Sequence, residues 1–241
     1  MVKLLVNIIV FVIDVLYRDR PYPRFYVLET IARVPYFAYT SVLHFYETLG
    51  LWRKADWLKV HFAESWNEMN HLLIMEALGG GNYWGDRILA QTVGLIYYWI
   101  IALLYAVAPS QAYFFMEEVE KHAFHTYDSF LTENEAELKE TTAPEVAIKY
   151  YRDGDLYMFD EFQTTRVPQS RRPQVDNLYD VFVNIRDDEN EHVKTMAACQ
   201  HPEAYQSLQS PHTAATQNQE SDVEVVVLSE AEKETETGVE V

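Results

Sequence analysis

Two short stretches of the chain repeat a spacing that suits metal binding. Glu68 precedes His71 by three residues, and Glu189 precedes His192 by the same interval. On a helix, residues three apart share a face, so each glutamate and its histidine can point at the same place. A carboxylate and an imidazole that converge form half of a metal site. Either copy alone is weak evidence, because this spacing also arises by chance on solvated helix surfaces, but two copies favour a shared site.

Two further glutamates complete a ligand set. Glu29 lies before the first pair and Glu120 lies between the pairs, both in hydrophobic surroundings where an unpaired carboxylate is costly to bury. Ferritin-like di-iron bundles use a lone glutamate from each of two helices and a Glu-x-x-His pair from each of the other two. Oxygen and nitrogen ligands suit iron or manganese, and the formal charge of this set balances two Fe(II). The pattern predicts an all-α, ferritin-like four-helix di-iron bundle that binds two iron ions.

Other residues of the same types leave alternatives open. Glu117 and Glu118 lie beside Glu120 and can replace it as the third carboxylate. Two pairs have histidine before glutamate, and we interpret them as helix-face pairs or as hydrogen-bonding partners behind the ligands. These pairs are His44 with Glu47 and His61 with Glu64.

Tyr127 follows Glu120 by seven residues, two helical turns, and therefore lies on the same helix face. A core aromatic and a redox-active tyrosine both fit this position, and the sequence by itself favours neither.

Helical segments must carry these ligands. A helix over 24–48, kinked at Pro35, carries Glu29, and a helix over 53–78 carries the first pair until three glycines stop it. Pro109 begins the helix that carries Glu120. The final helix covers 175–199. The intervening residues 132–174, rich in charge, tyrosine, proline and arginine, predict a long insertion with short helices.

Two apolar segments predict additional membrane-associated helices. Residues 2–17 are short for a span and lack a signal-peptide cleavage site, so we expect a helix lying on the bilayer, with Arg18, Arg20 and Arg24 near the headgroups. No charged residue occurs from Ile88 to Met116. This stretch suits a span, a buried core helix or a membrane-facing helix, and we expect its residues 88–108 to lie on one leaflet.

Composition limits the partners and the domain organisation. The 241 residues suit one sizeable domain, and a net charge of -18 makes nucleic acid an unexpected partner. Cys199 is the single cysteine, which excludes a disulfide framework and a cysteine-based metal site. We expect a domain over 1–201, with a membrane-associated helix in 1–20. We expect the acidic tail, 202–241, to be disordered.

Four motifs in order resemble the alternative oxidase family, and specifically its plastid terminal oxidase (plastoquinol terminal oxidase) branch. The resemblance covers roughly residues 1 to 200. The branch is indicated by the stretch from Asp155 to Gln163 and by the long interval between Glu120 and Glu189. The four motifs are Leu28-Glu29-Thr30, Asn67-Glu68-Met69-Asn70-His71-Leu72, Glu120-x-x-Ala123-x-His125-Thr126-Tyr127 and Arg186-Asp187-Asp188-Glu189-x-x-His192.

The resemblance implies a monotopic membrane enzyme that oxidises quinol, here plastoquinol, and reduces O2 to water without pumping protons. It implies a homodimer in a thylakoid or cyanobacterial inner membrane. Because the chain begins directly with the membrane-like segment, we expect a cyanobacterial-type protein or a form lacking its presequence. Two other readings share the ligand order: another di-iron enzyme, such as a hydroxylase or desaturase, and a non-enzymatic iron-binding bundle. The apolar segments favour the quinol oxidase.

Residue roles carry over from the same motifs. The resemblance implies a tyrosine near the irons at Tyr127 and a quinol pocket at Arg24, Leu28 and Thr126. Asn67 and Asp188 match positions that orient ligands by hydrogen bonds. Asn70 departs from the branch, which often has histidine there. The implied iron ligands are Glu29, Glu68, His71, Glu120, Glu189 and His192.

Overall fold

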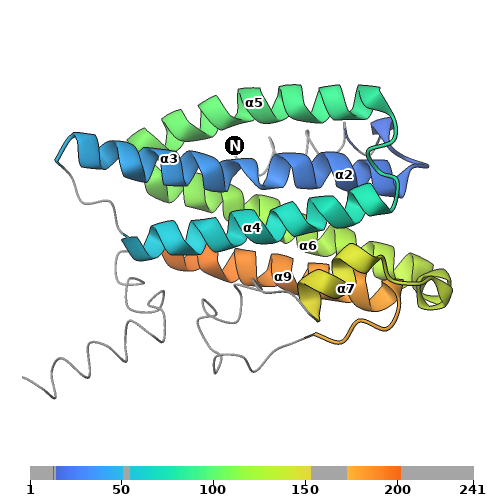
Figure 1. Ribbon diagram of the computed structural model, residues 1–241. Coiled ribbons are helices and arrows are strands. Elements are labelled where there is room, and N and C mark those ends of the chain that lie inside the picture. The colour runs from blue at the N-terminus through green and yellow to red at the C-terminus, as the bar shows by residue number, and fades with distance from the viewer. Residues whose placement is uncertain (1–12, 14, 51–54, 153–172, 202–241) are drawn as a thin grey trace, which may run out of the picture. The chain divides into compact units, whose positions relative to one another are not determined.

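The computed structural model describes residue 13 and residues 15–50, 55–152 and 173–201, and within these ranges all regular secondary structure is helical (Figure 1). The predicted all-α fold is therefore confirmed. The helices are α2 (Pro21–Ala32), α3 (Val34–Thr48), α4 (Ala55–Ala77), α5 (Trp84–Val107), α6 (Pro109–Glu140), α7 (Glu145–Tyr151) and α9 (Leu178–Cys199). The predicted disordered tail, 202–241, lies outside the described residues.

The bundle has four rows of helix: α2 continued by α3 forms one row, and α4, α6 and α9 form the other three. Figure 1 shows α3 continuing the direction of α2, with α4, α6 and α9 running alongside and α5 lying along α2 and α3. The predicted ligands are distributed one set to a row: α2 carries Glu29, α4 and α9 carry the Glu-x-x-His pairs, and α6 carries Glu120. All of these side chains are buried in the interior of the bundle.

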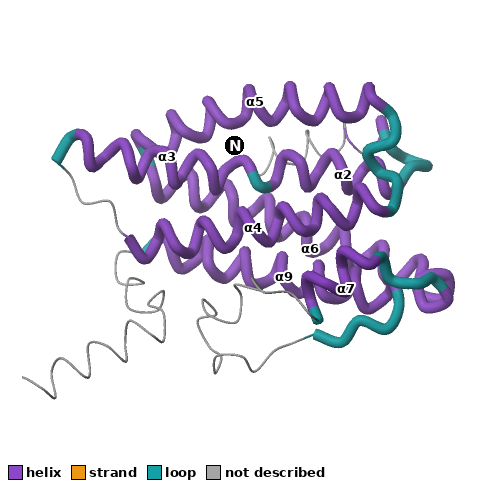
Figure 2. Tube along the Cα trace, viewed as in Figure 1, coloured by secondary structure: helices purple, strands orange, loops and turns teal. Residues whose placement is uncertain are grey.

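The kinked helix predicted over 24–48 is present as two helices, α2 and α3. They are separated by a turn at Arg33 alone, whose φ of -68° and ψ of -18° stay in the right-handed helical region, and Figure 2 shows this turn as a short loop segment between α2 and α3. Pro35 explains the position of the break. Proline has no N–H to bond the carbonyl of Ile31, and its ring clashes with that carbonyl, so the disruption falls in the turn before the proline.

The predicted irregular region over 132–174 also begins later than expected. Helix α6 continues to Glu140, with a local departure from helical geometry at Asn134. Leu131 and Leu138 on this extension are buried, and Lys139 pairs with Glu135 one turn earlier at 2.5 Å. Burial of two leucines outweighs the polar composition. Of the short helices predicted within the region, one is present as α7, and residues 153–172 lie outside the described residues.

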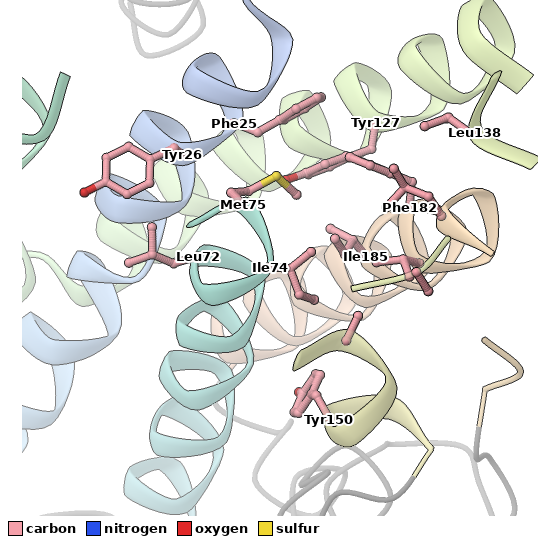
Figure 3. Close-up of a cluster of buried hydrophobic side chains, with 14 of the residues drawn as sticks. Phe25, Tyr26, Leu72, Ile74, Met75, Tyr127, Leu138, Tyr150, Phe182 and Ile185 are labelled. Atoms are coloured by element: carbon pink, nitrogen blue, oxygen red, sulfur yellow. The ribbon is translucent and has the colours of Figure 1, made fainter. Parts of the chain in front are cut away.

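The interior contains two apolar cores. The first core, shown in Figure 3, includes Phe25, Tyr26, Leu72, Ile74, Met75, Tyr127, Phe182 and Ile185. The second core includes Tyr36, Tyr39, Leu43, Trp57, Ile101, Tyr105, Tyr113, Met116 and Met196. Both contain several tyrosines, which can pack as apolar rings only if their hydroxyls find hydrogen-bond partners.

Two glycines end α4 and allow the chain to pass close to α2. Gly79 has a positive φ of 83°, a conformation that favours glycine, and the N–H of Gly80 bonds the carbonyl of Met75 at 2.8 Å. A Cβ on Gly80 would lie 2.6 Å from the carbonyl oxygen of Tyr22. The glycine stop predicted after residue 78 is thus present, and Gly80 also sets the approach of α4 to α2.

Helix α5 is attached on one side and exposed on the other. Asp86, in its first turn, is buried and accepts hydrogen bonds from Tyr17 at 3.0 Å and Arg20 at 2.5 Å. Along the helix, large apolar side chains are exposed, among them Leu95, Ile96, Trp99, Ile100, Leu103 and Val107. Among the described helices, α5 is the one long and apolar enough to cross a bilayer. Most of the helix predicted over 2–17 lies outside the described residues.

Candidate metal centre

The six predicted ligands are all buried, and the fold brings them together in two overlapping groups. Within each group, one ligand atom from every residue lies within 4.8 Å of the others. Glu68 and Glu189 belong to both groups. The groups are Glu29, Glu68, His71 and Glu189, and Glu68, Glu120, Glu189 and His192.

Imidazole nitrogens and carboxylate oxygens lie close across the cluster. His71 Nδ1 is 3.2 Å from Glu189 Oε1 and 3.6 Å from Glu29 Oε2. His192 Nδ1 is 2.9 Å from Glu68 Oε1 and 3.9 Å from Glu120 Oε1. These short distances join different helices of the bundle, so the tertiary fold, rather than either local motif, creates the cluster.

Many of these oxygens are buried without a well-aligned hydrogen bond to any described residue. They are Oε2 of Glu29, Glu120 and Glu189 and both oxygens of Glu68. Buried polar atoms are normally hydrogen-bonded, and buried carboxylates are otherwise paired or coordinate metals. Close but poorly aligned donor and acceptor atoms are expected where side chains converge on a shared cation. The cluster is therefore able to bind metal, and its oxygen and nitrogen donors fit iron.

Burial and mutual contacts shift the ionisation of the cluster. Burial, with the nearby charges of Glu189 and Glu29, raises the pKa of Glu68 well above its ordinary value. Burial likewise raises the pKa of Glu120 to about 8. Burial acts in the same sense on Glu189, but the close imidazoles of His192 and His71 outweigh it and lower its pKa. Protons therefore offset carboxylate charge within the cluster, and bound cations would displace protons from it.

Asp188 lies behind His71, as a position that orients ligands should. Its Oδ2 lies 3.3 Å from His71 Nε2 and accepts hydrogen bonds from Asn67 Nδ2 at 2.9 Å and from the Tyr151 hydroxyl at 2.9 Å. The Asn67 amide also donates to the Tyr150 hydroxyl at 2.7 Å. Asn67 and Asp188 were indicated by the motifs. The two tyrosines of α7 were not, because nothing local in the sequence links them to residues far along the chain.

Two tyrosines hydrogen-bond directly to predicted ligands. Tyr127 is buried and donates from its hydroxyl to Glu29 Oε1, and its ring stacks on Phe25 with centroids 4.5 Å apart (Figure 3). Tyr36 donates to Glu120 Oε1 at 2.6 Å. Sequence reasoning found Tyr127 and missed Tyr36. The signal existed, since Tyr36 follows Glu29 by seven residues and the chain keeps its direction across the break at Arg33.

The alternative residues lie outside both ligand groups. Lys121 pairs with Glu117 at 2.5 Å and with Glu118 at 3.1 Å, towards the surface of α6. His44 is exposed, and the side chain of Glu47 is not described. His61 and Glu64 are buried and bond each other at 3.0 Å.

The predicted quinol-pocket residues occupy two helices. Arg24 and Leu28 lie one turn apart on α2, both partly buried, and Leu28 packs against the first core. Thr126 is buried on α6 next to Tyr127, and its hydroxyl lies 3.2 Å from His122 Nε2. Their grouping around a quinol stays a prediction. Asn70, the departure from the branch pattern, donates to the carbonyl of Trp66 at 2.8 Å, a bond within its own helix.

A bundle whose helices bury two overlapping sets of glutamate and histidine defines a metal-binding protein of the ferritin-like carboxylate class. Within that class the chain belongs to the alternative oxidase family, since the family model "Alternative oxidase" matches residues 2–201. This family is a family of di-iron four-helix bundles.

Curated relatives named ubiquinol oxidases extend this finding. The chain is 62% identical over 209 residues to "Ubiquinol oxidase 4, chloroplastic/chromoplastic" of Arabidopsis thaliana, covering 87% of this chain and 59% of that protein. It is 27% identical over 167 residues to "Ubiquinol oxidase, mitochondrial" of Mangifera indica, covering 68% of this chain and 52% of that protein. It is 28% identical over 180 residues to "Ubiquinol oxidase 2, mitochondrial" of Glycine max, covering 74% of this chain and 48% of that protein. The chain thus spans about half to three fifths of these relatives.

Proposed function

We propose that this protein is a membrane-bound quinol oxidase that oxidises plastoquinol and reduces O2 to water without pumping protons. The main evidence for this proposal is the pair of overlapping ligand groups that share Glu68 and Glu189. Two irons bound there would supply the redox chemistry for O2. The relatives are named ubiquinol oxidases, and the sequence identity to the chloroplastic one is more than twice that to either mitochondrial one, which supports the plastid branch.

The ligand roles follow from membership of the two groups. Glu29 and His71 belong to one group alone, and we assign them to one iron. Glu120 and His192 belong to the other alone, and we assign them to the second iron. Glu68 and Glu189 belong to both groups, and each would serve both irons. Asp188 holds the His71 ring in place from the side away from the carboxylates, and Asn67 in turn holds Asp188.

Quinol oxidation needs a place for the quinol and a path for its electrons and protons. We place the quinol against Arg24, Leu28 and Thr126, and we assign Tyr127 as the redox-active tyrosine between that pocket and the irons. The hydrogen bond from Tyr127 to Glu29 supports this assignment, because it gives the phenol proton an acceptor at the metal centre. Burial, with the charge of Glu29, raises the pKa of Tyr127 well above its ordinary value, so the phenol stays protonated until it is oxidised.

The exposed face of α5 supports attachment to one leaflet of a membrane. Its large apolar side chains form a continuous row that a soluble storage bundle or soluble hydroxylase has no use for. Polar metal-binding helices cannot follow α5 into lipid, so we propose a monotopic protein, paired as a homodimer. Its location would be a thylakoid or cyanobacterial inner membrane.

The test is O2 uptake by purified, iron-loaded protein with a soluble plastoquinol analogue. We expect quinol-dependent uptake in the native protein and none in Glu189→Ala, which removes a carboxylate from both groups. Glu117→Ala is the matched control, because Glu117 pairs with Lys121 outside the cluster, and its uptake should stay close to native. Native uptake and full iron content in Glu189→Ala would contradict the proposal. Iron binding without quinol oxidation by the native protein would favour the storage bundle.

A further inference from the structure

A chain of buried polar side chains crosses the second core, apart from the ligand groups. The hydroxyls of Tyr105 and Tyr113 lie 2.7 Å apart, and the Tyr113 hydroxyl lies 2.8 Å from His61 Nε2. His61 Nδ1 lies 3.0 Å from Glu64 Oε2. All four residues are buried, with exposed fractions of 0–2%. They come from α4, α5 and α6, so the tertiary fold assembles the chain.

The direction of the hydrogen bonds follows from the chemistry of the groups. The Glu64 carboxylate accepts, so Nδ1 of His61 carries the ring proton and Nε2 is left as an acceptor. Tyr113 therefore donates its O–H to His61 Nε2, and Tyr105 donates to the Tyr113 oxygen. A phenol that donates to an imidazole backed by a carboxylate has a base ready to take its proton.

This base matters because a buried tyrosine is hard to oxidise. Burial raises the pKa of Tyr113 well above its ordinary value, so the phenol is protonated. Loss of one electron makes a phenol strongly acidic, and a positive charge in an apolar core is costly unless the proton leaves at once. His61 can accept that proton, and Glu64 can balance the charge that the imidazolium gains.

Aromatic rings connect Tyr113 to the metal centre. The Tyr113 ring centroid lies 5.1 Å from that of Tyr39, which lies 6.2 Å from Tyr36. Tyr36 lies 5.6 Å from the ring of His192 and hydrogen-bonds Glu120. Electrons can pass through such closely packed rings without movement of the backbone. The first core holds Tyr127 and the second core holds Tyr113, so the two tyrosines approach the ligands through different surroundings.

We propose that Tyr113 is a second redox-active tyrosine, which gives one electron toward the metal centre while its hydroxyl proton passes to His61 Nε2. The inference rests on the proposed function for its oxidant, O2, and its reductant, quinol. The O–H bond of Tyr113 breaks, an N–H bond forms on His61, and a neutral tyrosyl radical remains. A later electron from quinol returns to the radical, and His61 returns the proton.

The number of electrons that O2 reduction requires explains how a second redox-active tyrosine would contribute. Reduction of O2 to two water molecules takes four electrons and four protons, and two ferrous ions held by the ligand groups would supply two of the electrons. Tyr127 and Tyr113 can give one electron each. With both tyrosines, four electrons are available before a further quinol arrives, while the protons of the water molecules come from solvent and quinol.

The test is a search for the radical by electron paramagnetic resonance. Iron-loaded protein, reduced and freed of quinol, is mixed with O2 and frozen within milliseconds. We expect a tyrosyl signal in Tyr127→Phe that is lost when Tyr113→Phe is added. The signal should also be lost in Tyr127→Phe with His61→Gln, because glutamine cannot accept the phenol proton. Tyr26→Phe, a buried tyrosine of the first core away from His61, is the control that leaves the signal in place.

A merely structural role for Tyr113 would not alter this spectrum at equal iron content and equal thermal stability. If Tyr127→Phe gives no radical, or gives one that survives Tyr113→Phe, the inference is wrong, whereas quinol-dependent O2 uptake by the native protein upholds the proposed function separately. If the native protein consumes no O2, the same variants are oxidised with photogenerated ruthenium(III) tris-bipyridine, which needs no reaction at the irons. Absence of a Tyr113-dependent radical there overturns the inference as well.

Discussion

At the scale of single residues, the hydroxyl of Tyr127 is the group whose removal separates chemistry from folding. Tyr127→Phe keeps the ring stacked on Phe25 and deletes only the hydrogen bond to Glu29. We expect the variant to fold and bind iron but to lose most quinol-dependent O2 uptake, because one donor of an electron and a proton is gone. Oxygen-electrode rates with iron analysis measure this. Near-native turnover at full iron occupancy would show that Tyr127 serves only as an aromatic residue of the core.

Asp188 supports a second prediction at this scale. Asp188→Asn keeps the shape but removes the negative charge that faces His71 Nε2 at 3.3 Å and accepts from Asn67 and Tyr151. Loss of such a supporting carboxylate typically lowers metal affinity by about 10–100-fold, and we expect a loss in that range for Fe(II). A competition titration with a chelator measures it.

The neighbouring change Asp187→Asn is the control, because Asp187 pairs with Arg186 at a partly exposed site. Equal affinities in the two variants would show that the hydrogen bonds of Asp188 do not hold the His71 ring.

Which residues the sequence could identify depended on periodicity. Glu68 with His71 and Glu189 with His192 were identifiable because helical spacing puts each pair on one face. Glu29 and Glu120 were placed by their order along the chain and their apolar surroundings. Tyr151 was not identifiable, since its partner Asp188 is 37 residues away and only the packing of α7 brings the two together.

At the scale of elements, the contact between α4 and α2 depends on Gly80. A methyl group there would meet the Tyr22 carbonyl at 2.6 Å and Tyr26 Cβ at 2.8 Å, both attached to the backbone of α2. We expect Gly80→Ala to destabilise the protein, and overpacking of this kind costs about 1–3 kcal/mol. Thermal unfolding in detergent measures the effect.

Gly94→Ala is the matched control with the opposite sign. Its Cβ would meet Val34 Cγ2 at 3.5 Å, an ordinary contact, and alanine in a helix is more favourable than glycine by about 0.5–1 kcal/mol. An unchanged midpoint in Gly80→Ala would show that α4 and α2 can separate without cost.

The attachment of Tyr17 to α5 predicts a dependence on alkaline pH. Burial, then the hydrogen bond to Asp86, raises the pKa of Tyr17 to about 12 from its ordinary 10.0. The folded state therefore keeps a proton that the unfolded state releases. This contribution to stability is complete below pH 10 and is lost as pH rises towards 12. Chemical unfolding should show a shallower decline across this window in Tyr17→Phe than in the native protein. Parallel curves would contradict the assignment.

Element boundaries were less predictable than the ligands. Pro35 predicted a disturbance of the helix. A proline gives the same signal in the sequence for a kink as for a break, so the turn at Arg33 could not be predicted. The extension of α6 to Glu140 was missed because its composition is polar. Leu131 and Leu138, seven residues apart and both buried, were the available signal for a helix there.

At the scale of the whole molecule, the membrane prediction is tested by labelling. Asn82 and Ser110 flank α5 and are both exposed. We expect single cysteines at these positions, in a background with Cys199→Ala, to react with an impermeant thiol reagent from the same side of sealed vesicles, because the proposed monotopic attachment keeps both ends of α5 on one side. Labelling from opposite sides would show that α5 crosses. Detergent-solubilised protein, in which both positions react, is the control.

The sharing of Glu68 and Glu189 has a consequence for how the protein matures. A chain that has bound one cation has already ordered both shared carboxylates, so the second cation binds a site in which two ligands are already in position. The second cation then has only to displace the protons held on the remaining ligands, such as Glu120, whose pKa burial raises to about 8. We therefore expect cooperative uptake. Under iron shortage we expect the population to divide into chains without iron and chains with both irons. Iron shortage would then lower the number of active molecules rather than the activity of each one.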